Sequence, residues 1–164
     1  MNPLDISLDA TASRAVWVLR AWLIAVFPSL LYFLALAGIG ANAFQPPGRA
    51  FDVAFAGYSI LAAPLLETAL MLALARLLEL LIPQRRRVRI VLLATICALA
   101  HRIGGGWHQV LASAWPFLVY SVVLNAWLPR SNRVAFVLTA LVHSLYNATL
   151  FLVGALSLLR VAAA

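Results

Sequence analysis

Three polar clusters interrupt a chain that otherwise consists mostly of apolar residues. Glu67 follows Pro64 in one apolar segment, and His101 lies near the end of a second. His143 and Asn147 stand four residues apart in a third segment. These groups suit hydrolysis: a carboxylate can take a proton from water, while imidazole and amide groups stabilise the oxygen that becomes negative in the transition state. An acid at bilayer depth costs roughly 2.5 kcal/mol or more, so three such clusters predict one shared site.

The composition predicts a membrane protein. Of 164 residues, 65% are hydrophobic and 10% are charged, and the mean hydropathy is +0.99. A water-soluble domain of this length needs far more polar surface. We therefore expect an all-α, polytopic helical bundle that is integral to the membrane. The chain has arginine but no lysine, and it is rich in alanine, a bias typical of GC-rich genomes. We expect it in a bacterial inner (plasma) membrane.

The charge distribution argues against a nucleic-acid partner. The net charge is +7, but the arginines lie at the ends of apolar segments, where membrane topology and anionic lipid headgroups explain them. The bilayer is therefore the expected partner. The single cysteine, Cys97, excludes an internal disulfide and a cysteine metal cluster.

The apolar residues fall into five spans, at about 15–39, 51–82, 90–103, 108–128 and 134–161. About 20 apolar residues suffice to cross a bilayer. We expect a cytoplasmic segment at 1–13, followed by one membrane domain at 14–164. The second span exceeds the bilayer core and must tilt or kink at Pro64. The third is short and stops at the glycines 104–106.

The arginines also predict the orientation. One side of the membrane holds seven of them: Arg14, Arg85, Arg86, Arg87, Arg89, Arg130 and Arg133. The other side holds Arg49, Arg102 and Arg160. The positive-inside rule places the N-terminus in the cytoplasm and the C-terminus outside. Four tryptophans near span ends fit an aromatic belt: Trp17, Trp107, Trp115 and Trp127.

Depth supports a single site. Measured from the cytoplasmic ends of their spans at about 1.5 Å per residue, Glu67, His101 and His143 lie about 22, 17 and 13 Å deep. These heights are compatible. Asn147 shares a helix face with His143, whereas Ser144 does not face it, which argues against a Ser–His nucleophilic pair.

Structural roles are the alternatives for each residue. Glu67 could be a neutral acid bonded to a neighbouring helix, His101 could cap its helix, and His143 and Asn147 could bond helices together. Glu67, His101 and His143 could instead bind zinc, although the chain has no His-Glu-x-x-His. For His108, next to Trp107, we expect an interfacial position.

The ordered trio of motifs resembles the CAAX protease and bacteriocin-processing (CPBP, or Abi) family. That family carries Glu-Glu-x-x-x-Arg after a proline, Phe-x-x-x-His, and His-x-x-x-Asn or Asp. Here Pro64-Leu65-Leu66-Glu67 matches the start of the first motif, and Cys97-Ala98-Leu99-Ala100-His101 matches the second at its histidine. His143-Ser144-Leu145-Tyr146-Asn147 matches the third in full. The resemblance covers about residues 60–150.

The resemblance implies an intramembrane endopeptidase of glutamic type without a metal, in which Glu67 activates water and His101, His143 and Asn147 complete the site. The chain departs from the family at Cys97 and also at Thr68 and Leu72, which replace the second Glu and the Arg of the first motif. Arg76, one turn further on, could take the place of that Arg. Rebuilding the motif with Thr68→Glu and Leu72→Arg is expected to be neutral or activating.

The expected substrates are membrane-tethered peptides or protein tails. Two other classes compete with the protease. One is a non-catalytic relative, an immunity or partner-binding membrane protein that keeps the polar residues to join its helices. The other is a small transporter in which Glu67 carries a proton, against which the lack of an internal repeat argues. The sequence leaves the oligomeric state open.

Overall fold

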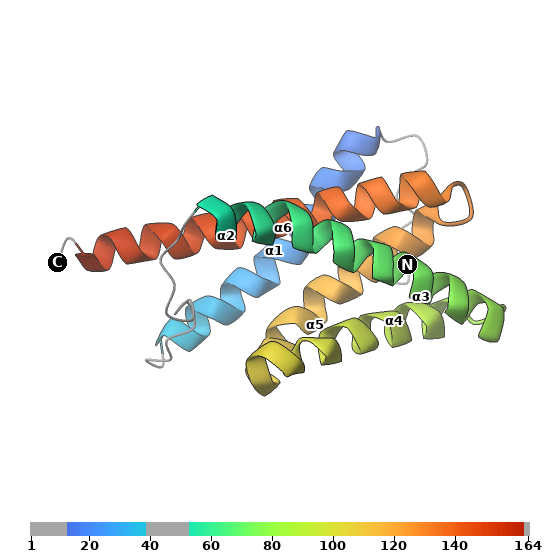
Figure 1. Cartoon of the computed structure of the whole chain (residues 1–164), viewed down its shortest axis with the longest axis horizontal. Coiled ribbons are helices and arrows are strands. Elements are labelled where there is room, and N and C mark those ends of the chain that lie inside the picture. Colours follow the sequence, from blue (N-terminus) through green and yellow to red (C-terminus); the bar gives the residue numbers. More distant parts are fainter. Residues whose placement is uncertain (1–12, 39–52, 163–164) are drawn as a thin grey trace.

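The computed structural model describes residues 13–38 and 53–162, and all regular structure within them is helical. Residues 1–12 of the expected N-terminal segment lie outside the described residues. The chain forms α1 (Arg14–Gly38), α2 (Val53–Gly57), the π-helical turn η1 (Tyr58–Ala62), α3 (Ala63–Leu81), α4 (Arg86–Ala100), α5 (Arg102–Trp127) and α6 (Asn132–Ala162) (Figure 1). The all-α class expected from the sequence is confirmed.

Four stretches are long and apolar enough to cross a membrane: Arg14–Ala35, Ala54–Leu81, Gly106–Trp127 and Asn132–Leu156. The remaining helix, α4, has 15 residues and rises only about 22 Å, less than the roughly 30 Å of a hydrocarbon core. The structure thus supports an integral membrane protein with four helices of spanning length.

The helical path breaks at the glycine run, as the sequence predicts. Helix α4 ends at Ala100 and α5 begins at Arg102, but the chain kinks within α5, at Gly106, with φ 73° and ψ −168°. This backbone is nearly exclusive to glycine. The stretch of α5 that is long enough to span therefore begins at Gly106.

Helices α2, η1 and α3 run on without a break, so that the expected second span is one continuous helical rod. Pro64 stands two residues after η1, and a proline within a continuous helix removes one backbone hydrogen bond. The buried residues of α3 recur every three or four positions: Pro64, Thr68, Met71, Ala75 and Leu78. This spacing makes one face of α3 apolar and turns it toward the other helices.

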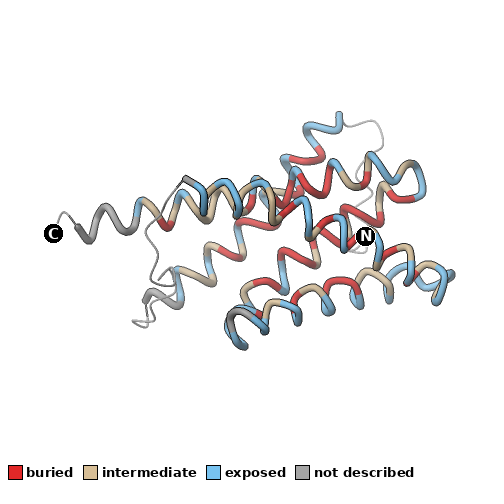
Figure 2. Tube along the Cα trace, in the orientation of Figure 1, coloured by how far each residue is buried: buried red, intermediate tan, exposed pale blue. Residues whose placement is uncertain are grey.

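Helix α5 lies at the centre of the bundle. It packs against α4, α6, α1 and α3, and 61% of its spanning window is buried, against 22–33% in the other three spanning helices. Figure 2 shows buried positions along α5 and on the faces of α1 and α6 toward it. Side chains of α5 can therefore contact residues from several helices at once.

Tryptophans join helices rather than forming only a belt. Trp17 is 2% exposed and packs edge-on against Trp127, with 5.9 Å between ring centroids. Its expected place in an aromatic belt is therefore wrong, because its ring fills the core. Trp115 donates from Nε1 to the carbonyl of Ile24 at 2.8 Å, and such bonds between helices strengthen membrane bundles.

A charged cluster ties the ends of α3, α4 and α6 together. Arg76 pairs with Glu79 and bonds to the side chain of Asn132. Arg89 approaches Glu79 at 3.8 Å. Arg76 is thus engaged about 13 Å along the helix axis from Glu67. The expectation that Arg76 takes the place of the family's Arg is therefore wrong, because its guanidinium points to the loop end of the bundle.

Candidate active site

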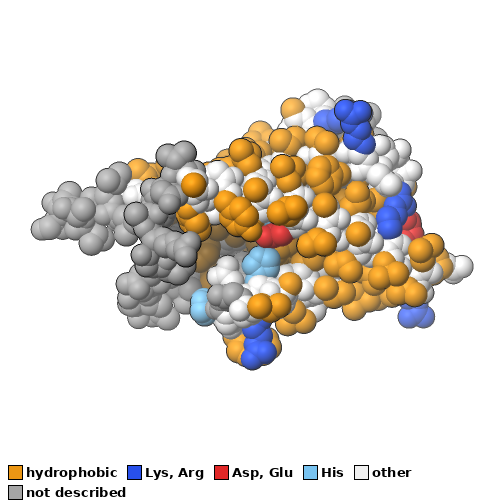
Figure 3. Space-filling model, viewed as in Figure 1, with side chains coloured by type: hydrophobic (Ala, Val, Ile, Leu, Met, Phe, Trp, Pro, Cys, Tyr) orange, Lys and Arg blue, Asp and Glu red, His pale blue; other side chains and the backbone are white. Residues whose placement is uncertain are grey.

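Three helices bring an acid and two imidazoles together. Glu67 of α3 lies with Oε2 3.6 Å from Nε2 of His143, on α6. The same oxygen lies 3.9 Å from Nε2 of His101, at the end of α4. Both distances allow charge interaction but exceed a direct hydrogen bond. An acidic and a histidine side chain adjoin on an otherwise largely hydrophobic face (Figure 3), so the expected convergence is what the structure shows.

His101 is held by the end of its helix. Its backbone N–H bonds to the carbonyl of Ala98 at 3.1 Å, and its ring Nδ1 lies 3.0 Å from the carbonyl of Cys97. The imidazole therefore folds back along α4. A neutral ring that donates from Nδ1 keeps Nε2 as an acceptor. His101 both caps the helix and presents Nε2 to Glu67, which combines the two roles considered from the sequence.

Aromatic side chains of α5 hold the two imidazoles. The ring of His143, 4% exposed, stacks on Tyr120 with 4.4 Å between centroids. Phe117 lies 4.9 Å from the ring of His101 and 5.8 Å from that of His143. These ring contacts restrict the rotation of the imidazoles, and packing of this kind is how functional side chains are kept in place.

The acid and the imidazoles face a cavity of about 180 Å³. Glu67, His101, His143 and Asn147 all contribute to its wall, as the sequence predicts for a shared site. The other residues that line it are Phe33, Gln109, Ala112, Ser113, Pro116, Phe117, Tyr120, Tyr146 and Leu150.

The sequence reasoning missed the contribution of α5. No site residue was expected there, yet Gln109, Ser113, Pro116 and Tyr120 form one wall of the cavity. Their spacing of four, three and four residues puts them on one helix face. A stripe of polar, proline and aromatic residues in an otherwise apolar span was the signal that could have found them.

Polar atoms at this cavity are left unpaired. Within the described residues, Glu67 Oε2, His143 Nδ1 and the Tyr120 hydroxyl are buried and have no hydrogen-bond partner. Native proteins rarely leave buried polar atoms without a hydrogen-bond partner. A polar cavity of this size has room for several water molecules or for a polar part of a ligand. The site is therefore suited to binding a small polar group.

Asn147 lies on the cavity wall and also joins two helices. Its side-chain Nδ2 donates to the backbone carbonyl of Ser59 in η1, at 2.8 Å. One of its two N–H groups is thus engaged in the fold. The structure places Asn147 where the sequence predicts it, and it supports the interhelical role that was considered as the alternative.

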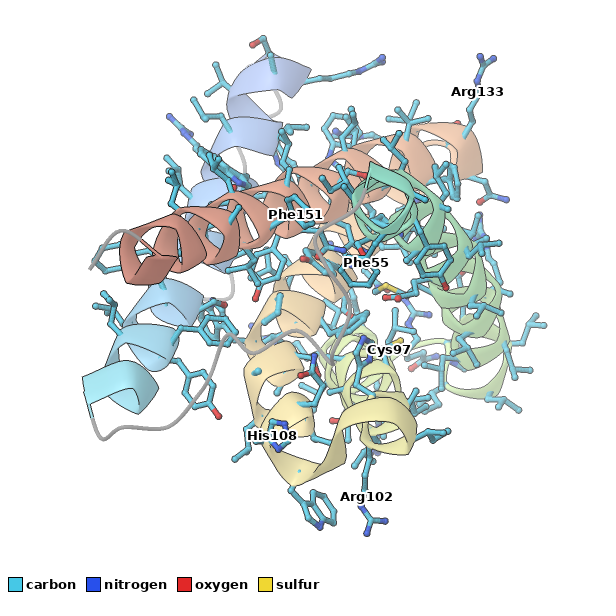
Figure 4. All side chains as sticks on the ribbon, turned by 60° about the vertical axis from the view of Figure 1, so that its left-hand side comes forward. Phe55, Cys97, Arg102, His108, Arg133 and Phe151 are labelled. Carbon is cyan, nitrogen blue, oxygen red and sulfur yellow. The ribbon has the colours of Figure 1, made fainter. Side chains whose placement is uncertain are left out.

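Other candidate polar residues stand apart from the cavity. Arg102 and His108 lie at the start of α5, at one end of the molecule (Figure 4). The guanidinium of Arg102 sits 4.6 Å from the ring centroid of Trp107. Asn125 donates to the carbonyl of Ser121 in its own helix. These contacts account for Arg102 and Asn125 without a role in the site.

The zinc alternative expects Glu67, His101 and His143 as ligands. Among the residues that the structure describes, no three His, Cys, Asp or Glu side chains are arranged to hold a metal ion. Metal dependence is a question for direct measurement with a chelator.

Comparison with known proteins adds no relative. No family model, no curated protein and no solved structure matches this chain. The observations that bear on function are therefore the geometry of the cavity and the three motifs.

Proposed function

We propose that the chain is an intramembrane endopeptidase of glutamic type, similar to the CPBP family, that hydrolyses membrane-anchored peptides or protein tails. The observation that carries the proposal is the carboxylate of Glu67 facing two imidazole Nε2 atoms in a cavity between helices of spanning length. A carboxylate beside imidazoles in a site sheltered from bulk water suits hydrolysis of an amide.

Glu67 is the general base in this proposal. Its carboxylate takes a proton from a bound water molecule while the water oxygen bonds to the carbonyl carbon of the substrate. The carbon–nitrogen bond then breaks, and the protonated Glu67 returns its proton to the leaving amine. One water is consumed, and Glu67 ends in its starting state, as general acid–base catalysis requires.

The imidazoles orient the water and stabilise charge. His101, which holds its Nδ1 against a carbonyl, offers Nε2 as an acceptor for the second hydrogen of the water. His143 is fixed by stacking on Tyr120, and when its Nε2 carries a proton it can donate to the developing oxyanion. The aromatic wall from α5 keeps both rings from turning away.

The proposed setting is a bundle of five passes with a cytoplasmic N-terminus. Helix α4 is the pass that brings the four helices of spanning length to five. The arginines around the 82–85 loop lie at the cytoplasmic face. The bilayer and a tethered peptide or protein substrate are the partners. A membrane anchor raises the local concentration of substrate at a cavity within the membrane.

The second candidate is a non-catalytic membrane protein whose polar residues join its helices. The observation that favours it is the bond from Asn147 to the Ser59 carbonyl, which links α6 to η1. In this interpretation the Glu67 and His143 pair likewise serves packing. The two candidates differ in whether the basicity of Glu67 matters.

The deciding experiment is cleavage of a library of membrane-tethered peptides by the purified protein in lipid. We expect cleavage by the wild type and a loss of at least about 10²-fold in Glu67→Gln, the usual scale for losing a general base. Glu79→Gln is the matched control, because Glu79 pairs with Arg76 and Arg89 outside the cavity. Its activity should stay near that of the wild type.

Two outcomes would contradict the proposal. If the wild type cleaves nothing, the non-catalytic candidate stands. If a chelator abolishes cleavage and added zinc restores it, Glu67 and the histidines act on a metal instead, and the glutamic mechanism is wrong.

A further inference from the structure

The helix that carries Glu67 is irregular where it passes α6. In η1, the backbone N–H of Ala63 bonds to the carbonyl of Tyr58, five residues earlier. A regular α-helix bonds four residues earlier. Such π turns are rare and are frequently found at functional sites.

The carbonyl of Ser59 loses its α-type and its π-type donor. In the α pattern it would accept from Ala63, but that N–H bonds to Tyr58. In the π pattern it would accept from residue 64, which is a proline and has no N–H. Pro64 thus removes the π-type bond to Ser59.

Asn147 supplies the missing donor from another helix. Its Nδ2 reaches the Ser59 carbonyl at 2.8 Å, a normal length for such a bond. The bond connects η1 to α6 one turn after His143. On the η1 side of this bond, Pro64 follows Ser59 by five residues and precedes Glu67 by three.

We propose that Pro64 and Asn147 form a positioning pair that sets Glu67 against His143. Pro64 frees the Ser59 carbonyl, Asn147 occupies it, and the two helices are thereby held in one register. The relevance of this register to catalysis rests on the proposed function, whereas the hydrogen-bond pairing does not. In this proposal Asn147 is a positioning residue that acts through the backbone of η1.

The pair can be tested because Pro64→Ala restores a backbone N–H at that position. In the wild-type background, Asn147→Leu keeps the side-chain volume but leaves a partly buried carbonyl unpaired. We expect the melting temperature in detergent to fall by about 3–8 °C. In the Pro64→Ala background, the restored N–H can donate to the Ser59 carbonyl, and Asn147→Leu should then shift the melting temperature by about 2 °C or less.

Asn125→Leu is the matched control. Asn125 is buried, whereas Asn147 is partly buried, and the amide of Asn125 donates to a carbonyl of its own helix, Ser121. Its effect should be the same in the wild-type and in the Pro64→Ala background. If Asn147→Leu lowers the melting temperature equally in both backgrounds, or in neither, the proposed pair is wrong.

Cleavage provides a second readout. If Asn147 only positions the helix, Pro64→Ala should restore at least about a tenth of the wild-type cleavage to Asn147→Leu. Cleavage that stays lost although the melting temperature recovers would overturn the positioning role. If the wild type cleaves no peptide, the proposed function fails, and the melting comparison alone decides whether the pair exists.

Discussion

The two glutamates that the structure describes have different surroundings. Glu79 pairs with Arg76 and lies near Arg89, so its charge is balanced by two guanidinium groups. Glu67 has no arginine partner among the described residues and instead faces Nε2 of His101 and Nε2 of His143. Its carboxylate is therefore not tied to a guanidinium and lines the cavity, where the proposed reaction needs a group that takes a proton from water.

The stability of Glu67→Gln separates a catalytic acid from a structural one. A neutral amide is cheaper to bury than a carboxylate, and Glu67 Oε2 has no hydrogen-bond partner among the described residues. We therefore expect the melting temperature of the variant in detergent to equal or exceed that of the wild type. A fall of more than about 5 °C, with activity lost in proportion, would instead mark Glu67 as a residue that holds the helices together.

Thr68 cannot readily be changed to the acid of the family motif. Its side chain is 0% exposed, on the face of α3 that packs into the bundle. Thr68→Glu with Leu72→Arg would bury new charge, and we expect a loss of about 3 kcal/mol or more in the free energy of unfolding. The burial of Thr68 therefore revises the sequence-based expectation of a neutral or activating change.

The matched control at this position is Thr68→Val. The Thr68 hydroxyl has no hydrogen-bond partner among the described residues, so its removal should be neutral or slightly stabilising. Unfolding of both variants by denaturant in mixed micelles makes the comparison. A Thr68→Glu, Leu72→Arg protein as stable as the wild type would show that the bundle opens at this face.

At the scale of the elements, the joint between α4 and α5 decides where His101 points. Helix α4 ends at Ala100, His101 follows as its cap, and the chain bends again at Gly106. The bend lets α5 run back along α4 so that Phe117 meets the ring of His101. The geometry of this joint therefore helps to place His101 against Phe117 at the candidate site.

Substituting Gly106 should strain that joint. Its φ of 73° with ψ near 180° is nearly closed to other residues, and Gly106→Ala should cost about 1–3 kcal/mol. An added Cβ would meet only the His108 ring at an ordinary 3.7 Å, so the cost comes from the backbone. Thermal unfolding measures it.

Gly57→Ala is the opposite case. Gly57 is helical, and nothing lies within 4 Å of an added Cβ. Alanine there should stabilise the helix by about 0.5–1 kcal/mol. If Gly106→Ala stabilises the protein as Gly57→Ala does, the bend at Gly106 is not as the structure shows it.

At the scale of the whole molecule, the arginines and the helix lengths indicate how the chain is oriented in the membrane. The basic loops before α4 and before α6 follow the ends of α3 and α5, so they lie on the same side of the bundle. The structure shows four helices of spanning length, and with α4 as a further pass the C-terminus lies opposite these loops. The number of passes can be inferred from which loops lie on the same side of the membrane.

Cysteine labelling tests this topology. After Cys97→Ala removes the native thiol, single cysteines at Gln84 and Ala163 should react from opposite sides of the membrane, Gln84 from the cytoplasm. A membrane-impermeant reagent, applied to intact cells and to inverted vesicles, makes the measurement. Reaction of both positions from the same side would refute five passes.

The sequence predicts the all-α class, the approximate helices and the acid and imidazole side chains that meet at the cavity. Hydropathy is a local property that needs no partner, so the apolar segments predicted the helices that the structure has, apart from their ends. Glu67, His101 and His143 could be grouped because unpaired ionisable residues are too costly to scatter through a bilayer. Helical rise then sufficed to compare their depths.

The way in which that site is built depends on tertiary packing. The aromatic wall of Phe117 and Tyr120, the distant engagement of Arg76 and the burial of Trp17 and Thr68 depend on which helix faces which. In a chain this apolar, hydrophobicity marks lipid-facing and core-facing positions alike, so packing partners cannot be read from it. The bond from Asn147 to Ser59 joins residues 88 positions apart, and no local pattern records it.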